Sequence, residues 1–339
     1  MKSTILFKTQ LLLSLLHFLS TFGYGQWSTD SLKIIDYHVH IFSEELMRNL
    51  NEQGYDMANS GFQILSDDFT MYKNIDSISR YNTASKMLLI STGYSYKDLT
   101  DNSEVKELLV VQQENDLLSS LIYSDRNKFI GFAGINPLKS YAVQEIIRCD
   151  DELGLDGVKL HLQSCNINLE DSIHLEKLLK VIKCCSERQL PLLIHNNAWN
   201  LYYGKEYARI FFTSILENVD PVTIIFAHTG GGGLYYSFTH DFLSAYSEQL
   251  MNHEMIQRHN IYFELSGTVS TTDSPRERAM PELEQLMSAI GAHRFLFGSD
   301  YPYRNSTAYI KELETRLNLS KSTLRQIIEN DIFDNLKNR

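Results

Sequence analysis

Cysteine is scarce in this chain of 339 residues, which contains four. They are Cys149, Cys165, Cys184 and Cys185, and no two of them show C-x-x-C spacing. Neither a zinc cluster nor a disulfide framework is therefore indicated. Buried free thiols are the expected form; one disulfide is the alternative, because an exported protein meets oxidising conditions.

Runs of basic residues and nucleotide-binding motifs are also missing. The net charge is −11 at pH 7, and an acidic surface without a basic run argues against nucleic acid and anionic membranes as partners. No G-x-G-x-x-G opens the first helical crossover, so a doubly wound dinucleotide-binding sheet is not favoured. The four glycines at 230–233 are not followed by Gly-Lys-Ser/Thr, which indicates a tight turn and not a phosphate-binding loop.

The first 25 residues have the pattern of an export signal. Lys2 and Lys8 precede an apolar run at 11–22 that is too short for a membrane span, and Gly23-Tyr24-Gly25 forms a small-x-small cleavage site. Removal of residues 1–25 changes the net charge from −11 to −13, because the segment carries two lysines and no acidic residue. We predict an exported protein, periplasmic or secreted, with no membrane association after cleavage; an uncleaved membrane anchor is the alternative.

Residues 26–339 are predicted to form one domain, a (β/α)8 TIM-type barrel. Short apolar segments alternate with longer amphipathic ones, as expected when parallel strands are joined by helices. The eight predicted strands are 33–40, 86–92, 128–135, 156–161, 191–196, 222–228, 260–266 and 294–299. The predicted helices between them include 103–124, 140–153, 171–188, 205–218, 236–258 and 277–290. The long insertion 41–85 after the first strand is a candidate cap over the barrel mouth.

Polar side chains gather at the C-terminal ends of these strands, where an α/β barrel keeps its chemistry. They are His38, His40, Lys159, His161, His195, His228 and Asp300. Burying imidazoles and carboxylates is unfavourable unless they are paired or bind a metal. Three histidines and a carboxylate, with an open position for water, match a catalytic divalent metal site, and the nitrogen-rich ligand set favours zinc, with manganese or iron as alternatives. Strand alternation further predicts that Asp36 shares a face with His38 and His40.

As a set, these segments resemble the amidohydrolase superfamily. They are Asp36-Tyr37-His38-Val39-His40, Gly157-Val158-Lys159-Leu160-His161, Leu193-Ile194-His195, Ala227-His228-Thr229-Gly230-Gly231 and Phe297-Gly298-Ser299-Asp300-Tyr301-Pro302. They are most similar to the amidohydrolase-related (amidohydrolase 2) branch, which includes aminocarboxymuconate-semialdehyde decarboxylase, aromatic-acid decarboxylases and lactone hydrolases. The resemblance covers residues 33–336.

The resemblance implies a role for each matching residue. His38, His40, His195 and Asp300 are expected to hold one metal ion. His228 and Asp300 are expected to be catalytic, with His228 as acid or base beside the metal.

Further residues are candidates for substrate binding. In two-metal members of the superfamily a lysine on the fourth strand is carbamylated and bridges the metals, but the residues around Lys159 resemble the single-metal branch. We therefore predict that Lys159 and His161 bind substrate or support the structure. Trp199 and Arg304 lie in loops predicted to face the barrel mouth, and Arg304 is the candidate partner of a substrate carboxylate.

The predicted activity is metal-dependent hydrolysis of a small carboxylated or cyclic metabolite, which would be a lactone, ester or amide, through a metal-activated water. Non-oxidative decarboxylation of an aromatic or unsaturated acid uses the same residues and is the alternative. A barrel that binds metal or sugar without turnover is a third hypothesis. The expected partner is a small-molecule substrate; a homodimer is compatible with the chain, but the sequence does not specify the oligomeric state.

Overall fold

The computed structural model describes residues 32–55, 78–79, 82–100, 103–270 and 278–337. The chain divides into two units, Met1–Leu32 and Lys33–Arg339, and the second unit carries every element described below. The predicted export signal at 1–25 lies outside the described residues, as does most of the insertion after the first strand.

Eight parallel strands form the predicted barrel, each paired with the next in chain order. They are β1 (Ile35–Ile41), β2 (Lys86–Ser91), β3 (Phe129–Ile135), β4 (Gly157–His161), β5 (Leu192–His195), β6 (Thr223–Phe226), β7 (Asn260–Glu264) and β8 (Phe295–Leu296). The segment after β8 closes the ring on β1, because the Tyr301 N–H donates to His38 O at 3.1 Å and the His40 N–H to Tyr301 O at 2.8 Å. The prediction of a (β/α)8 barrel is confirmed.

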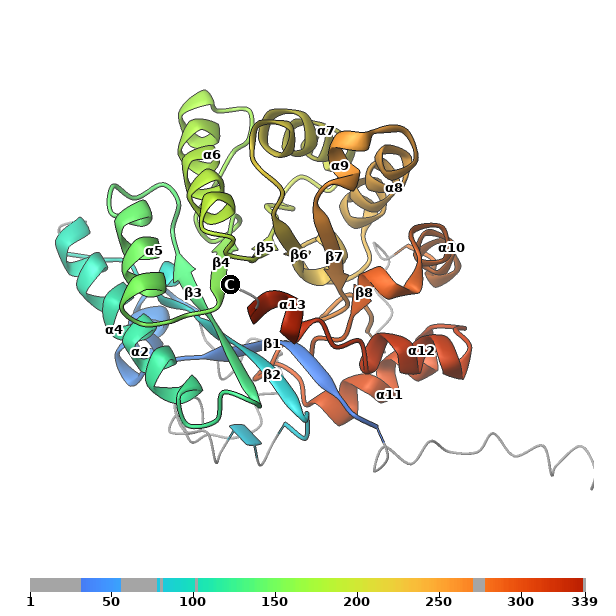
Figure 1. The fold of residues 1–339 in the computed structure, drawn as a ribbon, viewed down its shortest axis with the longest axis horizontal. Coiled ribbons are helices and arrows are strands. Elements are labelled where there is room, and N and C mark those ends of the chain that lie inside the picture. The colour runs from blue at the N-terminus through green and yellow to red at the C-terminus, as the bar shows by residue number, and fades with distance from the viewer. Residues whose placement is uncertain (1–31, 56–77, 80–81, 101–102, 271–277, 338–339) are drawn as a thin grey trace, which may run out of the picture. The chain divides into compact units, whose positions relative to one another are not determined.

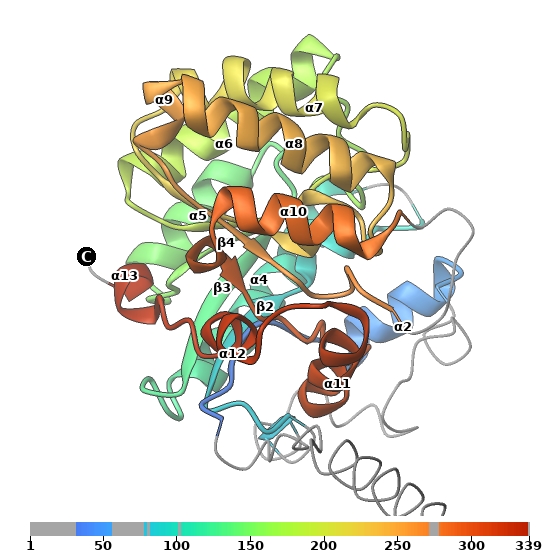
Figure 2. The same ribbon diagram turned by 90° about the vertical axis from the view of Figure 1, so that its right-hand side faces the viewer.

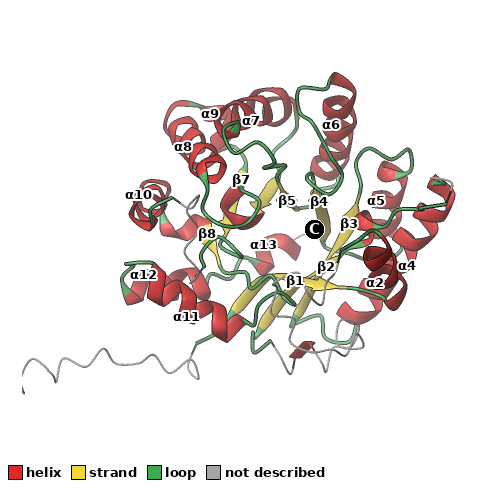
Figure 3. Ribbon diagram, turned by 180° about the vertical axis from the view of Figure 1, so that it is seen from behind, coloured by secondary structure: helices red, strands yellow, loops and turns green. Residues whose placement is uncertain are grey.

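Helices surround the ring of strands (Figure 1 and Figure 3). They are α2 (Glu44–Glu52), α4 (Glu104–Ile122), α5 (Ala142–Asp151), α6 (Ser172–Glu187), α7 (Gly204–Ile210), α8 (Ser237–Asn252), α9 (Glu254–Gln257), α10 (Met280–Ile290), α11 (Ser306–Arg316), α12 (Lys321–Ile328) and α13 (Phe333–Lys337). Side-chain caps fix several helix starts; for example, Asp171 accepts the N–H groups of Ile173 and His174. The predicted helix 236–258 is two helices, because extended backbone at His253 ends α8 and begins α9.

The N-terminal end of the barrel is closed by α13, which lies across the centre of the strand ring in Figure 1 and at the opposite end of the strands from α2 in Figure 2. The Phe333 ring packs edge-on against Tyr37 with centroids 5.5 Å apart. The Tyr37 hydroxyl donates to Asn330 O at 2.9 Å and accepts the Ile332 N–H at 2.8 Å. These contacts join one apolar core, which comprises Ile35, Tyr37, Leu88, Ile90, Ile130, Phe132, Leu193, Ile225, Ala227, Leu296, Ile332, Phe333 and Leu336.

A register shift in β1 separates the core from the polar end of the barrel. Asp36 is opposite Met87, whereas His40 is opposite Ile90, and the shift lies between Asp36 and Val39. Ile90 belongs to the apolar cluster inside the barrel, whereas Met87 is buried outside that cluster, so the expectation that Asp36 shares the face of the histidines is wrong. The extra residue reverses the alternation, and both Tyr37 below it and His38 above it reach the barrel interior.

The four cysteines are buried free thiols, as predicted. Among the described helices, none is long and apolar enough to cross a membrane.

A buried carboxylate anchors the chain just beyond β1. Glu114 of α4 is fully buried and accepts the Ser43 N–H at 3.1 Å through Oε2, while its Oε1 has no hydrogen-bond partner within the described part of the chain. Burial raises the pKa of Glu114 from 4.5 to about 7. The folded chain therefore binds more protons at Glu114 than the unfolded chain between these values, and this group makes stability fall as pH rises through that interval.

We expect Glu114→Gln to raise the free energy of unfolding at pH 8 by about 1–3 kcal/mol relative to the wild type, and to leave it unchanged at pH 4, because glutamine removes the cost of a buried negative charge. Urea denaturation at both pH values measures the difference. Glu176→Gln, at an exposed position of α6, is the charge-matched control and should show no such pH dependence. Equal effects of Glu114→Gln at pH 4 and pH 8 would contradict the assignment.

Candidate active site

Three ligand-type side chains converge at the C-terminal end of the barrel. His38 and His40 come from β1, and Asp300 comes from the segment that closes on β1. The two Nε2 atoms are 3.1 Å apart, and Asp300 Oδ1 lies 3.5 Å from Nε2 of His38 and 3.4 Å from Nε2 of His40. This group is one of two in the described residues whose geometry could hold a metal ion; the other is His38, His228 and Glu264.

Contacts on the Nδ1 atoms set the ring orientation of both histidines. His38 Nδ1 is 2.7 Å from Glu264 Oε1, and an ionised carboxylate only accepts hydrogen bonds, so Nδ1 carries the proton and Nε2 presents its lone pair. His40 Nδ1 is 3.2 Å from the Thr92 hydroxyl. Burial lowers the pKa of His38 to about 3 and also lowers that of His40, which keeps both imidazoles neutral at physiological pH. Neutral imidazole is the form that binds metal.

Glu264, which the sequence analysis missed, connects the elements of the site. Its carboxylate accepts four hydrogen bonds: from His38 Nδ1, from the His228 N–H at 2.9 Å, and from the N–H and hydroxyl of Ser266 at 2.7 and 2.8 Å. Burial alone would raise the pKa of Glu264, but His38 and His228 together lower it to about 2. The available signal was a carboxylate at the end of a largely apolar strand.

His228 and Asp300, the two predicted catalytic residues, both have left-handed backbone. Their φ angles are 52° and 61°, and Thr229 has a φ of 54°. Such conformations cost about 1–3 kcal/mol each and occur where surrounding contacts impose them. For His228 those contacts are its N–H to Glu264 and its Nδ1, 2.7 Å from Ser266 O.

A second wall of the site comes from β4 and β5. Lys159 is fully buried, and its Nζ has no hydrogen-bond partner among the described residues. Burial lowers the pKa of Lys159 to about 8, against the opposing effect of Glu264 and Asp300. His161 stacks on His195 with ring centroids 3.8 Å apart, and His195 in turn lies edge-on to His228 at 4.6 Å.

His195 does not belong to either metal-type group, although it borders the same site. Its Nε2 is buried without a hydrogen-bond partner in the described part of the chain. A methyl group at Gly232 would lie 3.7 Å from this atom and 3.1 Å from Gln163 Oε1, so the glycine turn packs closely over His195.

The family of the chain is shown by a match to the amidohydrolase family model over residues 92–330. This chain belongs to the amidohydrolase family. The match includes Lys159, His195, His228 and Asp300 and begins after His38 and His40. The predicted superfamily is therefore confirmed. No curated protein sequence matches the chain significantly.

Solved structures share the fold at low identity. A 5-carboxyvanillate decarboxylase from Novosphingobium aromaticivorans, with bound manganese and 3-methoxy-4-hydroxy-5-nitrobenzoic acid, has a TM-score of 0.60 and 14% identity over 92% of this chain and 99% of its own. A dihydroxybenzoic acid decarboxylase from Polaromonas, with manganese and 2-nitroresorcinol, has a TM-score of 0.57 and 16% identity over 91% of this chain and 98% of its own. A Pseudomonas putida protein, provisionally assigned as a 2-pyrone-4,6-dicarboxylic acid hydrolase, has a TM-score of 0.54 and 18% identity over 89% of this chain and 97% of its own.

Two other predicted substrate-binding residues lie in loops of this amidohydrolase. Trp199 follows β5 and is 74% exposed. Arg304 lies over the Tyr309 ring, and its Nε is 3.4 Å from Glu312 Oε2, so a substrate carboxylate would have to compete with an internal partner.

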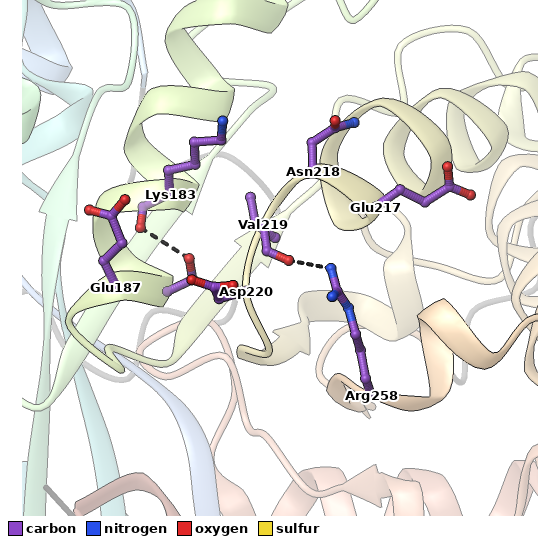
Figure 4. A pocket seen from close by; sticks show the side chains of 8 residues that line it. Lys183, Glu187, Glu217, Asn218, Val219, Asp220 and Arg258 are labelled. Atoms are coloured by element: carbon purple, nitrogen blue, oxygen red, sulfur yellow. Dashed lines mark hydrogen bonds between the residues drawn. The ribbon is translucent and has the colours of Figure 1, made fainter.

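A cleft of about 380 Å³ lies elsewhere on this amidohydrolase, at the N-terminal end of the strands (Figure 4). It is lined by Lys183, Ser186, Glu187, Glu217, Asn218, Val219, Asp220 and Arg258. Arg258 donates to the carbonyls of Leu216 and Val219. Its lining residues precede β5, β6 and β7, at the end of the barrel away from the histidines.

Gly298 has no side chain, and the space that a side chain would fill is occupied by Glu264 and His38. A methyl group there would lie 2.3 Å from Glu264 Oε2 and 3.0 Å from His38 Cβ. We expect Gly298→Ala to lower the free energy of unfolding by about 1–3 kcal/mol through overpacking, as measured by denaturant titration. Gly131→Ala in β3 is the control, because the atoms nearest to its methyl group would belong to the flexible side chains of Leu118 and Ile122, at 3.1–3.2 Å. A loss no greater than the control's would contradict the packing argument.

Proposed function

We propose that this amidohydrolase is a metal-dependent decarboxylase of an aromatic or unsaturated acid. The observation that carries the proposal is the position of Asp300, whose Oδ1 faces both Nε2 atoms of the β1 histidines at 3.4–3.5 Å. His38 Nε2 presents a lone pair to this carboxylate, so a cation between them is needed to hold them together. A divalent ion bound in this way supplies the positive charge that draws electrons from a carboxylated substrate.

The similar structures support the same choice. The Novosphingobium and Polaromonas enzymes are decarboxylases with bound manganese. Hydrolysis, which the sequence analysis placed first, is retained as the second candidate because the Pseudomonas protein has a hydrolase assignment.

The four residues inferred to hold one divalent ion are His38, His40, His195 and Asp300. Ligand atoms about 2.0–2.2 Å from an ion lie roughly 3–3.6 Å from one another, which fits the separations of 3.1–3.5 Å within the His38, His40 and Asp300 group. The buried, unpartnered Nε2 of His195 is a suitable further ligand atom. Manganese is our preferred ion in place of zinc, given the ion in the two similar decarboxylases. When bound, such an ion supplies positive charge that withdraws electrons from the substrate.

His228 is placed to exchange a proton through one ring atom. Its Nδ1 donates to the Ser266 carbonyl, which accepts only, so Nε2 faces the substrate side as the atom that gains or loses a proton. In the proposed reaction the bond between the ring or alkene carbon and the carboxylate breaks, and its electron pair stays on that carbon. Carbon dioxide leaves as this bond breaks. His228, which enters the step with a proton on each ring nitrogen, transfers the Nε2 proton to that carbon and returns to the neutral ring with its proton on Nδ1; solvent then restores the Nε2 proton.

Export and domain organisation remain predictions. We infer that residues 1–25 are cleaved and that 26–339 form the mature domain. N-terminal sequencing of the exported protein tests both: a mature chain beginning at Gln26 agrees, and one beginning at Met1 contradicts cleavage.

We expect the manganese-loaded protein to release carbon dioxide from at least one acid in a panel that contains 5-carboxyvanillate and 2,6-dihydroxybenzoate. The panel also contains lactones, which test for hydrolysis. His228→Ala should lower the rate by about 10²–10⁴-fold, because proton transfer is lost, and should keep its manganese as measured by elemental analysis. His253→Ala, at an exposed position, is the control. Lactone opening without carbon dioxide release would replace decarboxylation by hydrolysis.

Glu264→Gln is expected to weaken manganese binding by about 10–100-fold, because the neutral amide orients His38 less firmly and makes it less basic. Calorimetric titration of the metal-free protein measures the affinity. The control is Glu114→Gln, a buried glutamate that contacts Ser43 and not the histidines. Equal affinities for the Glu264 and Glu114 variants would contradict the role of Glu264.

A further inference from the structure

The two walls of the site differ in hydrogen-bonding character. The wall from β1 and the β8 segment presents metal-ligand atoms: the lone pair on Nε2 of His38, Nε2 of His40 and the Asp300 carboxylate. The wall from β4 presents donors, on Lys159 and His161, two residues apart on one strand and therefore on the same face. Lone pairs suit a cation, and donors suit an anion.

Lys159 is the main donor of this second wall. Its side chain is fully buried, and none of its three N–H groups has a hydrogen-bond partner among the described residues. An ammonium without a partner is costly to bury. Its neighbours across the sheet, Gly134 and Leu193, carry no polar side chain that could satisfy it.

His161 adds a donor of fixed identity. Its Nδ1 accepts the Ser164 N–H at 3.1 Å, so the neutral ring carries its proton on Nε2. The ring lies between Tyr94, at 5.3 Å between centroids, and His195, at 3.8 Å. Packing on both faces holds the plane of the ring and thus the direction of its donor.

The charges of the site favour an anionic ligand beside Lys159. Glu264, which is buried, and Asp300, which is partly exposed, are the carboxylates that face the imidazoles of His38 and His40, and a divalent ion would balance their two charges. The ammonium of Lys159 is then in excess, and an anionic oxygen of the substrate would neutralise it.

That oxygen is not part of the carboxylate that leaves. Decarboxylation moves negative charge out of the leaving carboxylate, so a cation paired with it stabilises the ground state more than the transition state and slows the reaction. A cation paired with an oxygen that keeps or gains charge as carbon dioxide leaves has the opposite effect.

We propose that Lys159 and His161 form an anion subsite that binds a second anionic oxygen of the substrate, from a hydroxyl or a second carboxylate, distinct from the departing carboxylate. This subsite rests on the proposed decarboxylase function, and it makes Lys159 a determinant of substrate specificity. A structural role for Lys159, as internal counter-ion of Glu264 and Asp300, is the competing explanation.

Binding of three probes to the manganese-loaded protein separates these roles. Calorimetry with benzoate, 3-hydroxybenzoate and isophthalate compares one anionic group with an added hydroxyl or an added carboxylate. We expect the wild type to bind one of the last two about 10-fold or more tighter than benzoate, since a hydrogen bond to a charged group contributes about 1.5–3 kcal/mol. The tighter probe identifies the second oxygen.

Lys159→Met should abolish this preference, and its manganese content should equal that of the wild type. Lys159→Arg, which keeps the charge, should retain part of it, and His161→Asn, which keeps a donor, should retain more of it than His161→Leu. The charge-matched control is Lys180→Met, at an exposed position of α6. Circular dichroism checks each fold, and the Arg variant tests the subsite if the Met variant does not fold.

Three results would overturn the subsite. The first is an unchanged preference in Lys159→Met. The second is a loss of manganese that parallels the loss of binding of all three probes. The third is two manganese ions per chain, one of which is lost on substitution of Lys159, because this residue would then be a bridging ligand. Failure to release carbon dioxide from any acid, with the probe preference intact, would refute the decarboxylase and leave the anion subsite standing.

Discussion

The hydrogen bonds to the buried carboxylate of Glu264 organise the C-terminal end of this barrel. One side chain from β7 reaches His38 on β1 and the backbone of His228 beyond β6, and it also accepts both donors of Ser266. It thereby sets the tautomer of one inferred metal ligand and the backbone of the inferred acid at the same time. Both depend on Gly298, where any side chain would displace the carboxylate.

The opposite end of the barrel supplies the stability that this arrangement needs. Left-handed backbone at His228 and Asp300 and an unpartnered ammonium at Lys159 are each unfavourable. The apolar core beneath them, closed by Phe333 and Tyr37, is extensive. The register shift in β1 is the boundary between the two regions, because it lets Tyr37 face the core and His38 face the site in consecutive positions.

The fold and much of the site could be predicted from the sequence because both depend on local patterns. Apolar runs that alternate with amphipathic ones define strands and helices, and polar residues at strand ends marked His38, His195 and His228. The orientation of Asp36 could not be predicted, because a bulge in one strand shows only against its neighbour; its carboxylate instead accepts the N–H groups of His38 and Ser299.

The side-chain partners that meet across the barrel could not be predicted from a single sequence either. Glu264 and His38 are 226 positions apart and meet only when the ring closes. The contact of Arg304 with Glu312 likewise depends on how α11 packs after the β8 segment. In both cases long-range packing, and not local pattern, decides which charged groups meet.

The proposed chemistry depends on one divalent ion held by side chains from β1, from β5 and from the segment that closes the ring. Anomalous diffraction at the manganese absorption edge, from crystals grown with excess manganese, locates this ion. We expect a single strong peak within bonding distance of His38 Nε2, His40 Nε2, His195 and Asp300. A peak bonded to other residues, or no peak at saturating manganese, would contradict it.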